Sequence, residues 1–324
     1  MDQFADDAVL DLVPDTVAEF RGAVLTGLAK LQKAIPSQFF YDAEGSRLFD
    51  HICTLPEYYP TRTETGILRH NAAAVAAALP PQAVLVEYGS GASVKVRLLL
   101  DALERPAAYV PIDISRQHLL AAASVLAFDY PALAVMPVCA DFTRFPALPP
   151  GLLPGPRVGF FPGSTIGNFH PADATRLLRR FRRQLGPHGS LLIGVDLKKD
   201  PAILHAAYND AAGVTAAFNR NLLARANREL SASFDIEAFA HDAFWNAPAG
   251  RIEMHLRSTV AQKVLVAGRS FRFTAGETIH TENSYKYTLD EFRACAVAAG
   301  FAPAAVWTDP AGLFSVHLLA DDAE

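Results

Sequence analysis

Residues 83–94 read AVLVEYGSGASV, an apolar run followed directly by a turn that contains two glycines. The run has the length and composition of a buried strand. Glycines between a strand and a helix let the backbone approach a ligand where a Cβ atom would collide. The third glycine position of the dinucleotide fingerprint is Val94, which argues against a pyrophosphate-binding NAD site. The stretch therefore predicts the first strand and turn of a nucleotide-binding sheet without a phosphate loop.

Further apolar runs alternate with helical patterns after this stretch, at residues 107–112, 132–138, 157–162 and 190–195. Strands that alternate with helices form a parallel, doubly wound sheet. The C-terminal segment VWTDPAGLFSVHLLA, residues 306–320, supplies two last strands joined by a turn. We predict a Rossmann-like α/β sheet that the C-terminal segment completes.

The pattern changes after Asp196, which indicates an inserted second domain of α+β type. Asp200 and Pro201 begin a helical stretch that reaches about Leu230. Residues 251–287 then alternate between apolar and polar side chains, as an antiparallel meander does. Helical periodicity returns at Thr288, where TLDE forms a capping box.

The composition excludes several classes of protein. The 324 residues carry a net charge of −5 and are 51% hydrophobic, so neither a nucleic-acid-binding face nor disorder is expected. Cys53, Cys139 and Cys295 are too few and too widely spaced for a disulfide framework or a metal site. The first twenty residues lack an export signal, and no apolar run could span a membrane. We expect a monomeric cytoplasmic protein whose partner is a small molecule.

Polar side chains stand at the ends of two further predicted strands. Asp113 ends the second strand, where a carboxylate can accept hydrogen bonds from both hydroxyls of a ribose. Asp141 and Phe142 end the third, offering a carboxylate to an adenine amino group and a ring to its face. Each aspartate alone could be a helix cap, but together they predict an adenosine site. Adenosine without pyrophosphate indicates S-adenosylmethionine, whose positive sulfonium needs no cluster of Lys or Arg.

Several longer motifs are more specific. They are FFYDAEGSRLFDHICTLPEYYPTRTE (39–64), EYGSGAS (87–93), CADF (139–142), GSTIGN (163–168), YNDAAGVTAAFNRN (208–221) and RIEM (251–254). Together they resemble the histidine-specific Nα-methyltransferase family, which forms hercynine, the trimethylated histidine of ergothioneine biosynthesis. The resemblance extends from about Phe39 to the C-terminus.

The resemblance implies a class I methyltransferase that uses S-adenosylmethionine and releases S-adenosylhomocysteine. It implies an S-adenosylmethionine-binding domain of residues 61–196 and 287–324, and a substrate-binding α+β domain of residues 8–60 and 197–286. The implied cofactor contacts are Tyr41, Gly89, Lys95, Asp113, Asp141 and Phe142. The implied amino-acid contacts are Tyr58, Gly163, Asn168, Tyr208, Glu282 and Ser284, with Met254 beside the side-chain pocket.

These residue types suit a histidine substrate. Asn168 and the Tyr208 hydroxyl can donate hydrogen bonds to its carboxylate. Glu282 and Ser284, two apart on a predicted strand, face the same side and can serve the two imidazole nitrogens. We expect three successive in-line methyl transfers to a neutral α-amine without a dedicated catalytic base, because solvent can take the proton.

Three alternatives remain open from the residues alone. The same chemistry could act on tryptophan or tyrosine, although a carboxylate at Glu282 is less useful beside an indole. A nicotinamide-dependent oxidoreductase and a non-catalytic module that binds S-adenosylmethionine are the other two. No metal is expected, because the ten histidines show no ligand grouping and His280 is interpreted as an exposed strand residue.

Overall fold

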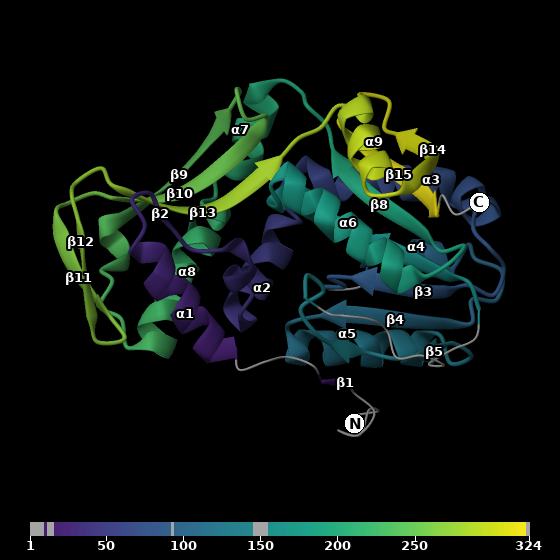
Figure 1. Cartoon of the computed structure of the whole chain (residues 1–324), viewed down its shortest axis with the longest axis horizontal. Helices are drawn as coiled ribbons and strands as arrows, with labels where there is room; N and C mark the ends of the chain where they lie inside the picture. The colour runs from purple at the N-terminus through teal and green to yellow at the C-terminus, as the bar shows by residue number, and fades with distance from the viewer. Residues whose placement is uncertain (1–9, 12–15, 92–93, 145–154, 322–324) are drawn as a thin grey trace. The chain divides into compact units, whose positions relative to one another are not determined.

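A computed structural model describes residues 10–11, 16–91, 94–144 and 155–321 of the protein (Figure 1). The chain divides into two compact units. The first comprises Met1–Val13, Pro60–Lys198 and Lys286–Glu324, and the second comprises Pro14–Tyr59 and Lys199–Tyr285. Among the described residues, none of the helices combines the length and the apolar character that a membrane crossing needs.

The first unit is built on a nine-stranded sheet with the order β1-β6-β4-β3-β7-β8-β15-β14, in which β5 pairs with β4. Its strands are β1 (Leu10–Asp11), β3 (Val84–Tyr88), β4 (Ala108–Asp113), β5 (Ala134–Val135), β6 (Val138–Cys139), β7 (Arg157–Phe161), β8 (Ser190–Asp196), β14 (Phe301–Thr308) and β15 (Phe314–Asp321). Strands β3, β4, β6, β7 and β8 run parallel, whereas β15 is antiparallel to both neighbours. The predicted Rossmann-like sheet, completed by the C-terminus, is confirmed.

The strand order reverses at β3, because the chain passes from β3 to β4 and β6 on one side and then crosses to β7 and β8 on the other. Open α/β sheets bind ligands at the carboxyl ends of the strands beside such a reversal. The topology therefore assigns the ligand edge of this sheet to the turns that follow β3, β4, β6 and β7.

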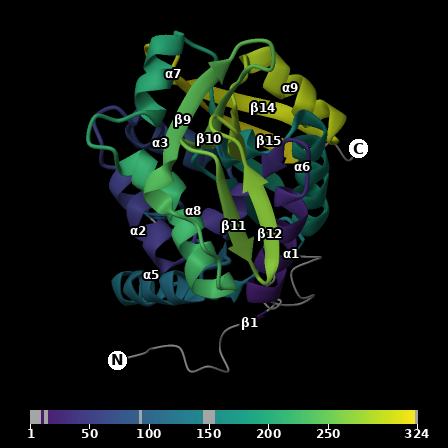
Figure 2. The same cartoon turned by 90° about the vertical axis from the view of Figure 1, so that its left-hand side faces the viewer.

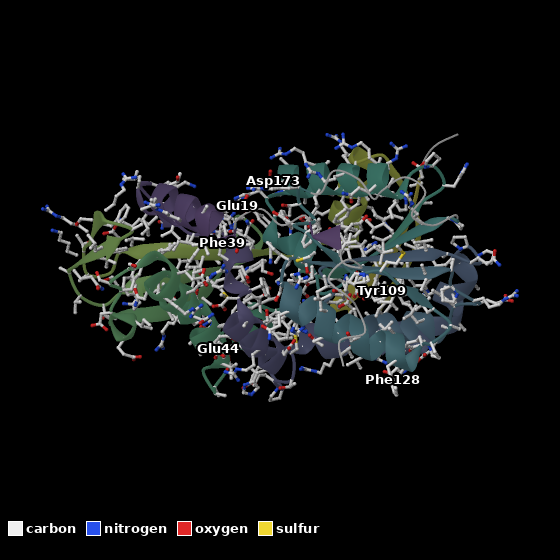
Figure 3. All side chains as sticks on the ribbon, turned by 90° about the horizontal axis from the view of Figure 1, so that it is seen from below. Glu19, Phe39, Glu44, Tyr109, Phe128 and Asp173 are labelled. Atoms are coloured by element: carbon white, nitrogen blue, oxygen red, sulfur yellow. The ribbon has the colours of Figure 1, made fainter. Side chains whose placement is uncertain are left out.

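Helices cover both faces of this sheet. They are α3 (Tyr59–Ala78), α4 (Val94–Leu100), α5 (Arg116–Asp129), α6 (Pro171–Leu185) and α9 (Leu289–Ala298). One core cluster joins Leu68 of α3 and Val96 of α4 to Leu85 of β3. Tyr88, which points to the other face of β3, stacks on Phe181 of α6 with ring centroids 3.9 Å apart. The side chains in Figure 3 illustrate the result, with Tyr109 fully buried and Phe128 of α5 79% exposed at the surface.

Two details of the first unit differ from the sequence expectations. The predicted strand at 132–138 consists of two short pieces, β5 and β6, separated by Met136 and Pro137. Proline has no N–H to donate to a ladder, so pairing is interrupted there. The predicted second domain begins at residue 8, yet β1 pairs in parallel with β6 of the first unit. A two-residue strand is too short to show any periodicity in the sequence.

The second unit contains a four-stranded sheet of order β2-β13-β10-β9 and a separate hairpin of β11 and β12 (Figure 2). Its strands are β2 (Lys33–Ala34), β9 (Phe239–Asn246), β10 (Arg251–Ser258), β11 (Gln262–Val266), β12 (Arg269–Phe273) and β13 (Thr278–Tyr285). Its helices are α1 (Thr16–Leu28), α2 (Ala43–Ile52), α7 (Pro201–Tyr208) and α8 (Val214–Leu230), with 3-10 turns at Ser37–Phe40 and Ile236–Ala238.

The predicted meander is wrong in its pairing. β10 pairs with β9 and β13, and the β11–β12 hairpin lies between β10 and β13 in the chain without joining their sheet. The predicted long helix up to Leu230 is also divided in two. The Asp210 carboxylate accepts hydrogen bonds from the amides of Val214 and Thr215, at 2.8 Å each, and so starts α8 as a new helix.

Candidate active site

The turn after β3 requires its glycines. Gly89 and Gly91 have φ angles of +72° and +49°, in the left-handed region that favours glycine. The Gly89 amide donates to the carbonyl of Ile112 at the end of β4, at 2.8 Å. A Cβ atom on Gly89 would lie 3.5 Å from Cε1 of Phe142. The structure thus brings together two predicted cofactor contacts that come from the ends of β3 and β6.

Asp113 orders the same turn from the end of β4. Its Oδ2 accepts from the Gly91 amide at 3.2 Å, and its Oδ1 accepts from the Ser115 amide at 2.9 Å. Burial raises the pKa of Asp113, while these backbone hydrogen bonds oppose the rise. Because each carboxylate oxygen can accept more than one hydrogen bond, the group retains capacity for ribose hydroxyls.

Asp141 presents a buried oxygen that no hydrogen-bond donor reaches within the described part of the chain. Its Oδ1 accepts from the amide and the hydroxyl of Thr143, at 2.8 and 2.6 Å. Its Oδ2 is buried without a hydrogen-bond partner among the described residues, and Nε of Arg144 lies 3.8 Å away, beyond hydrogen-bond distance. A buried carboxylate oxygen of this kind is costly unless a donor reaches it. The amino group of an adenine, lying against the Phe142 ring, is a donor of the required type, so the residues present fit the expected cofactor.

Lys95 and Gly163 meet at a buried carboxylate that the sequence analysis did not select. Glu64 of α3 is fully buried. Its carboxylate accepts from the Gly163 amide, at 2.9 and 3.1 Å, and forms an ion pair with Lys95 Nζ. A Cβ atom on Gly194 would lie 1.9 Å from Glu64 Oε1, so a larger residue at this position would displace the carboxylate. Glu64 therefore connects a predicted cofactor contact to a predicted substrate contact.

The loop after β7 holds two of the predicted amino-acid contacts. Gly163 and Ser164 both adopt positive φ angles, +80° and +56°. The left-handed conformation is unfavourable for serine, and here Ser164 is held by accepting a hydrogen bond from the Asp196 amide at 2.9 Å. The 3-10 turn Thr165–Asn168 follows directly and ends in Asn168, which is half-buried. A constrained loop thus carries both Gly163 and Asn168.

Three predicted amino-acid contacts lie together in the second unit. The Tyr208 hydroxyl, at the end of α7, donates to Ser284 Oγ at 2.7 Å. The Tyr58 ring lies edge-on to the Tyr208 ring, with centroids 6.5 Å apart. Burial, and to a lesser extent the neighbouring Tyr208 and Glu282, raises the pKa of Tyr58 well above its usual value. Tyr58 is therefore a neutral hydroxyl and not a phenolate.

Met254 and Glu282, the remaining predicted amino-acid contacts of the second unit, share one face of the β10–β13 pair with Ser284. Met254 lies directly opposite Glu282 in the antiparallel register, and Ile252 lies opposite Ser284. Directly opposed residues project to the same side of a sheet, so Met254, Glu282 and Ser284 face the same way. Tyr41, a predicted cofactor contact, also belongs to this unit and packs edge-on against Phe49 at 5.6 Å.

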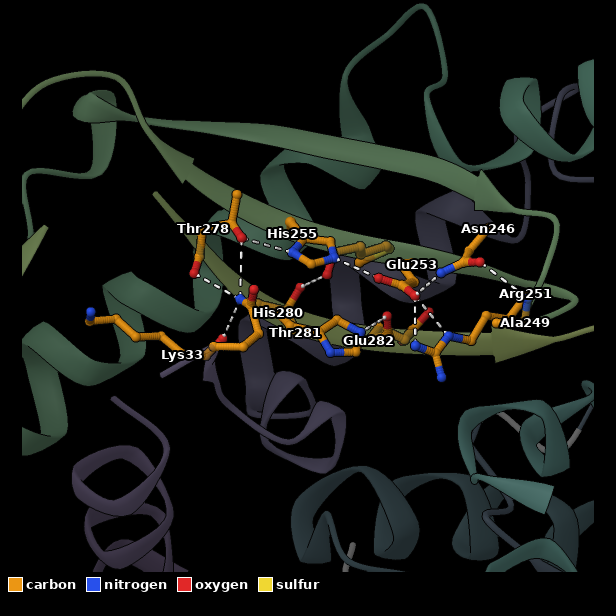
Figure 4. A network of polar contacts seen from close by, with 12 residues as sticks. Lys33, Asn246, Ala249, Arg251, Glu253, His255, Thr278, His280, Thr281 and Glu282 are labelled. Atoms are coloured by element: carbon orange, nitrogen blue, oxygen red, sulfur yellow. Dashed lines mark hydrogen bonds and ion pairs between the residues drawn. The ribbon is translucent and has the colours of Figure 1, made fainter. Parts of the chain in front are cut away.

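The other face of the pair carries a polar network (Figure 4). Glu253 accepts from Arg251 Nε and Nη2 at 2.9 and 2.6 Å, from Asn246 Nδ2 at 2.7 Å, and from His255 Nε2 at 3.0 Å. Burial raises the pKa of Glu253, but the hydrogen bonds from His255, Arg251 and Asn246 outweigh it and lower the pKa to about 2. This carboxylate is charged and supplied with donors.

The same network corrects the expectation for His280. The structure places His280 half-buried, stacked on His255 with centroids 4.7 Å apart. One potential ligand atom each from Glu253, His255 and His280 lies within 4.8 Å of the others, a grouping that the sequence does not reveal because strand pairing creates it. The carboxylate, however, is already paired with Arg251, whose charge opposes a divalent cation. We interpret the group as a structural hydrogen-bond network.

Comparisons with known proteins agree with this geometry. The family described as "Histidine-specific methyltransferase, SAM-dependent" matches residues 20–321. The chain is 46% identical to a histidine N-alpha-methyltransferase of Mycolicibacterium smegmatis, over 95% of this chain and 97% of that protein. It is 44% identical to the histidine N-alpha-methyltransferase of Mycobacterium tuberculosis, over 93% and 94%. It is 32% identical to ergothioneine biosynthesis protein 1 of Neurospora crassa, over 89% of this chain and 33% of that protein. The chain belongs to the family of histidine-specific, S-adenosylmethionine-dependent methyltransferases.

Proposed function

We propose that the protein transfers methyl groups from S-adenosylmethionine to the α-amine of L-histidine, three times in succession, and so forms hercynine. The observation that carries the choice of substrate is the shared face of Glu282, Ser284 and Met254, with Tyr208 bonded to Ser284. A carboxylate and a hydroxyl beside one another match the two nitrogens of an imidazole. The names of the two mycobacterial relatives support the same substrate, and the name of the fungal relative assigns that protein to ergothioneine biosynthesis.

The residues at the strand ends of the first unit would hold the methyl donor. Asp113 accepts from the ribose hydroxyls, and Asp141 Oδ2 accepts from the adenine amino group. The bound donor supplies an electrophilic methyl group on a positively charged sulfur. We infer that Lys95, which pairs with Glu64, also meets the carboxylate of the donor.

The substrate is fixed at both of its ends. Glu282 accepts the imidazole N–H, and Ser284, which accepts from Tyr208, can donate to the other ring nitrogen. We infer that Asn168 donates to the carboxylate, whereas Tyr208, whose single hydroxyl proton goes to Ser284 Oγ, orients that serine toward the substrate. This anchoring directs the neutral amine toward the methyl group, and orientation provides most of the acceleration.

The protons released after the first and second transfers need no dedicated base, because solvent can take them, and the third transfer to the neutral dimethylamine releases none. The raised pKa of Tyr58 makes its phenol a poor base at neutral pH, although it can still hydrogen bond to the amine or to a bridging water. The first two transfers each replace an amine N–H by a methyl group, and the third converts the neutral dimethylamine, which has no N–H, into the quaternary ammonium. Trimethylation therefore requires an amine pocket that depends on few hydrogen bonds, and the residues named for the amine are correspondingly few.

Incubation with S-adenosylmethionine and an equimolar pool of the protein amino acids tests the proposal. Mass spectrometry should show histidine gaining up to three methyl groups, while tryptophan and tyrosine remain unmodified. The Glu282→Ala variant should lose about tenfold or more in kcat/KM for histidine, because a hydrogen bond to a charged group contributes about 1.5–3 kcal/mol. A wild-type chain that methylates another amino acid in preference, or a variant that keeps the full histidine preference, contradicts the assignment.

The alternatives differ in their support. Tryptophan or tyrosine remains the nearest competitor, and the amino-acid pool decides it directly. Membership of an S-adenosylmethionine-dependent methyltransferase family argues against the oxidoreductase and the non-catalytic module. A monomeric, cytoplasmic protein remains our proposal. The odd number and wide spacing of Cys53, Cys139 and Cys295 suit a reducing compartment, and light scattering measures the oligomeric state.

A further inference from the structure

A β-bulge in β13 determines which way Glu282 points. Met254 is opposite Glu282, yet the next residue of β10, His255, is opposite His280, so Thr281 is an extra residue in β13. On a regular strand His280 and Glu282, two residues apart, would share a face. Here His280 projects with His255, whereas Glu282 projects with Met254. The bulge therefore directs Glu282 to the face that carries Ser284 and Tyr208.

His280 stabilises the bulge from the face of the sheet that carries Glu253 and His255 (Figure 4). Its Nε2 donates to the carbonyl oxygen of Glu282 at 3.0 Å, which ties together the residues on either side of Thr281. The His280 ring stacks on His255 with an interplanar angle of 17°. His255 is itself fixed through Nε2 to Glu253 at 3.0 Å and through Nδ1 to Thr278 Oγ1 at 3.2 Å. The donor that reaches the Glu282 carbonyl thus belongs to an immobilised ring.

Thr281 stabilises the bulge from the opposite side, which faces α8. It is buried, and its Oγ1 lies 3.0 Å from the Met254 carbonyl oxygen and 2.8 Å from Asn219 Oδ1. Asn219, which is fully buried on α8, also donates to the His255 carbonyl at 3.0 Å. Two independent sets of contacts, one on each face, therefore stabilise the same single-residue irregularity.

We propose that His280 and Thr281 are positioning residues that determine selectivity for the substrate side chain. They act through the bulge that turns Glu282 toward the imidazole, and they need not touch the substrate themselves. The inference rests on the proposed function, because it assigns Glu282 to the substrate side chain.

The first test compares His280→Phe with His280→Gln. Phenylalanine keeps a ring for stacking on His255 but has no N–H for the Glu282 carbonyl, whereas glutamine keeps a side-chain N–H. We expect the KM for histidine to rise about tenfold in His280→Phe, because one hydrogen bond is lost. In His280→Gln the KM should recover at least partly, because the side chain again has an N–H. The KM for S-adenosylmethionine and kcat at saturating histidine should stay within about twofold. Phe244→Leu, at the exposed end of the same stack, serves as the matched control and should leave both KM values unchanged.

Thr281 supplies a second, independent test if His280→Phe is poorly folded. Thr281→Val removes the contacts to Asn219 and Met254 with little change of shape, and Thr281→Ser retains the hydroxyl as the control. We expect a selective rise in the histidine KM for valine and not for serine. Unchanged histidine KM in both His280→Phe and Thr281→Val, or an equal rise in the KM of both substrates, overturns the positioning role. Absence of histidine methylation by the wild-type chain in the same assay overturns the proposed function instead, so the two failures are distinguishable.

Discussion

Buried carboxylates are held in opposite ways in the two units. Glu87 of β3 is 1% exposed and receives a hydrogen bond from the Tyr109 hydroxyl, and burial raises its pKa to about 8. Glu253 of β10 is 7% exposed, yet donors from three side chains bring its pKa to about 2. Glu87 lies deeper in the protein and has one hydroxyl donor, whereas Glu253 lies nearer the surface and has donors from Arg251, Asn246 and His255. Depth of burial and supply of donors together decide the charge of each carboxylate.

The supply of hydrogen-bond donors distinguishes carboxylates that can bind a ligand from carboxylates that only stabilise the fold. At the strand ends of the first unit, burial raises the pKa of Asp113, and Asp141 Oδ2 lacks a hydrogen-bond partner among the described residues. A ligand with N–H and O–H groups can complete such carboxylates. Glu253 already accepts from Arg251, Asn246 and His255 and needs no ligand. Three substitutions test this distinction.

The largest effect is expected at Glu253. Glu253→Ala removes the carboxylate from a buried ion pair and leaves Arg251 without that partner, which costs about 3–5 kcal/mol in comparable cases. Chemical denaturation should show a loss of this size. Asp242→Ala on the neighbouring strand removes only a half-exposed pair with Arg257, 3.9 Å apart, and should change stability by less than about 1 kcal/mol. Equal losses in the two variants would contradict the distinction.

The pH dependence of the same variant follows from the sign of the shift. The pKa of Glu253 is lower in the folded chain than the ordinary value of 4.5. Its stabilising contribution is therefore fully present above about pH 4.5 and is lost as the pH falls toward 2. The stability difference between wild type and Glu253→Ala should accordingly shrink on acidification across this range.

An intermediate effect is expected at Asp113. Asp113→Ala removes the acceptor for the ribose hydroxyls and the support of the Gly91 amide. Affinity for S-adenosylmethionine should fall about 100-fold, because two hydrogen bonds to a charged group are lost and each contributes about 1.5 kcal/mol. Calorimetry with S-adenosylmethionine measures this loss, and Asp290→Ala, an exposed residue of α9, provides the control. Undiminished affinity in Asp113→Ala would place the adenosine elsewhere.

The smallest effect is expected at Glu87. Its folded pKa is raised, so the protonated form stabilises the fold below the ordinary value of 4.5, and this stability is lost as the pH rises toward 8. Glu87→Gln is neutral at every pH and can still accept from Tyr109. The variant should therefore gain about 1 kcal/mol relative to wild type between pH 6 and pH 7 in denaturation experiments. A difference that does not change with pH would show that Glu87 is charged in the fold.

The sequence predicts the cofactor residues of the site better than the residues around Glu64 and Glu282. The cofactor residues follow buried strands, and the carboxyl ends of parallel strands must meet at one edge of the sheet, so the sequence alone predicts that Gly89 and Phe142 lie together. Glu64 could not be selected in this way, because it is one acidic residue within a long helix and becomes distinctive only beside Lys95 and the Gly163 amide. The family resemblance named Glu282, but nothing in the pattern showed the bulge that directs it.

The sequence by itself determined the alternation of strands and helices, the insertion after Asp196, the glycine turn and the family, because these depend on local composition and on periodicity along the chain. Only the tertiary structure decided the pairing of β10 with β13, the grouping of Glu253, His255 and His280, and the slot that Gly194 leaves for Glu64. Such features arise when residues far apart in the chain become neighbours. Strand register and a single bulged residue then set their directions, and neither leaves a periodic signal in the sequence.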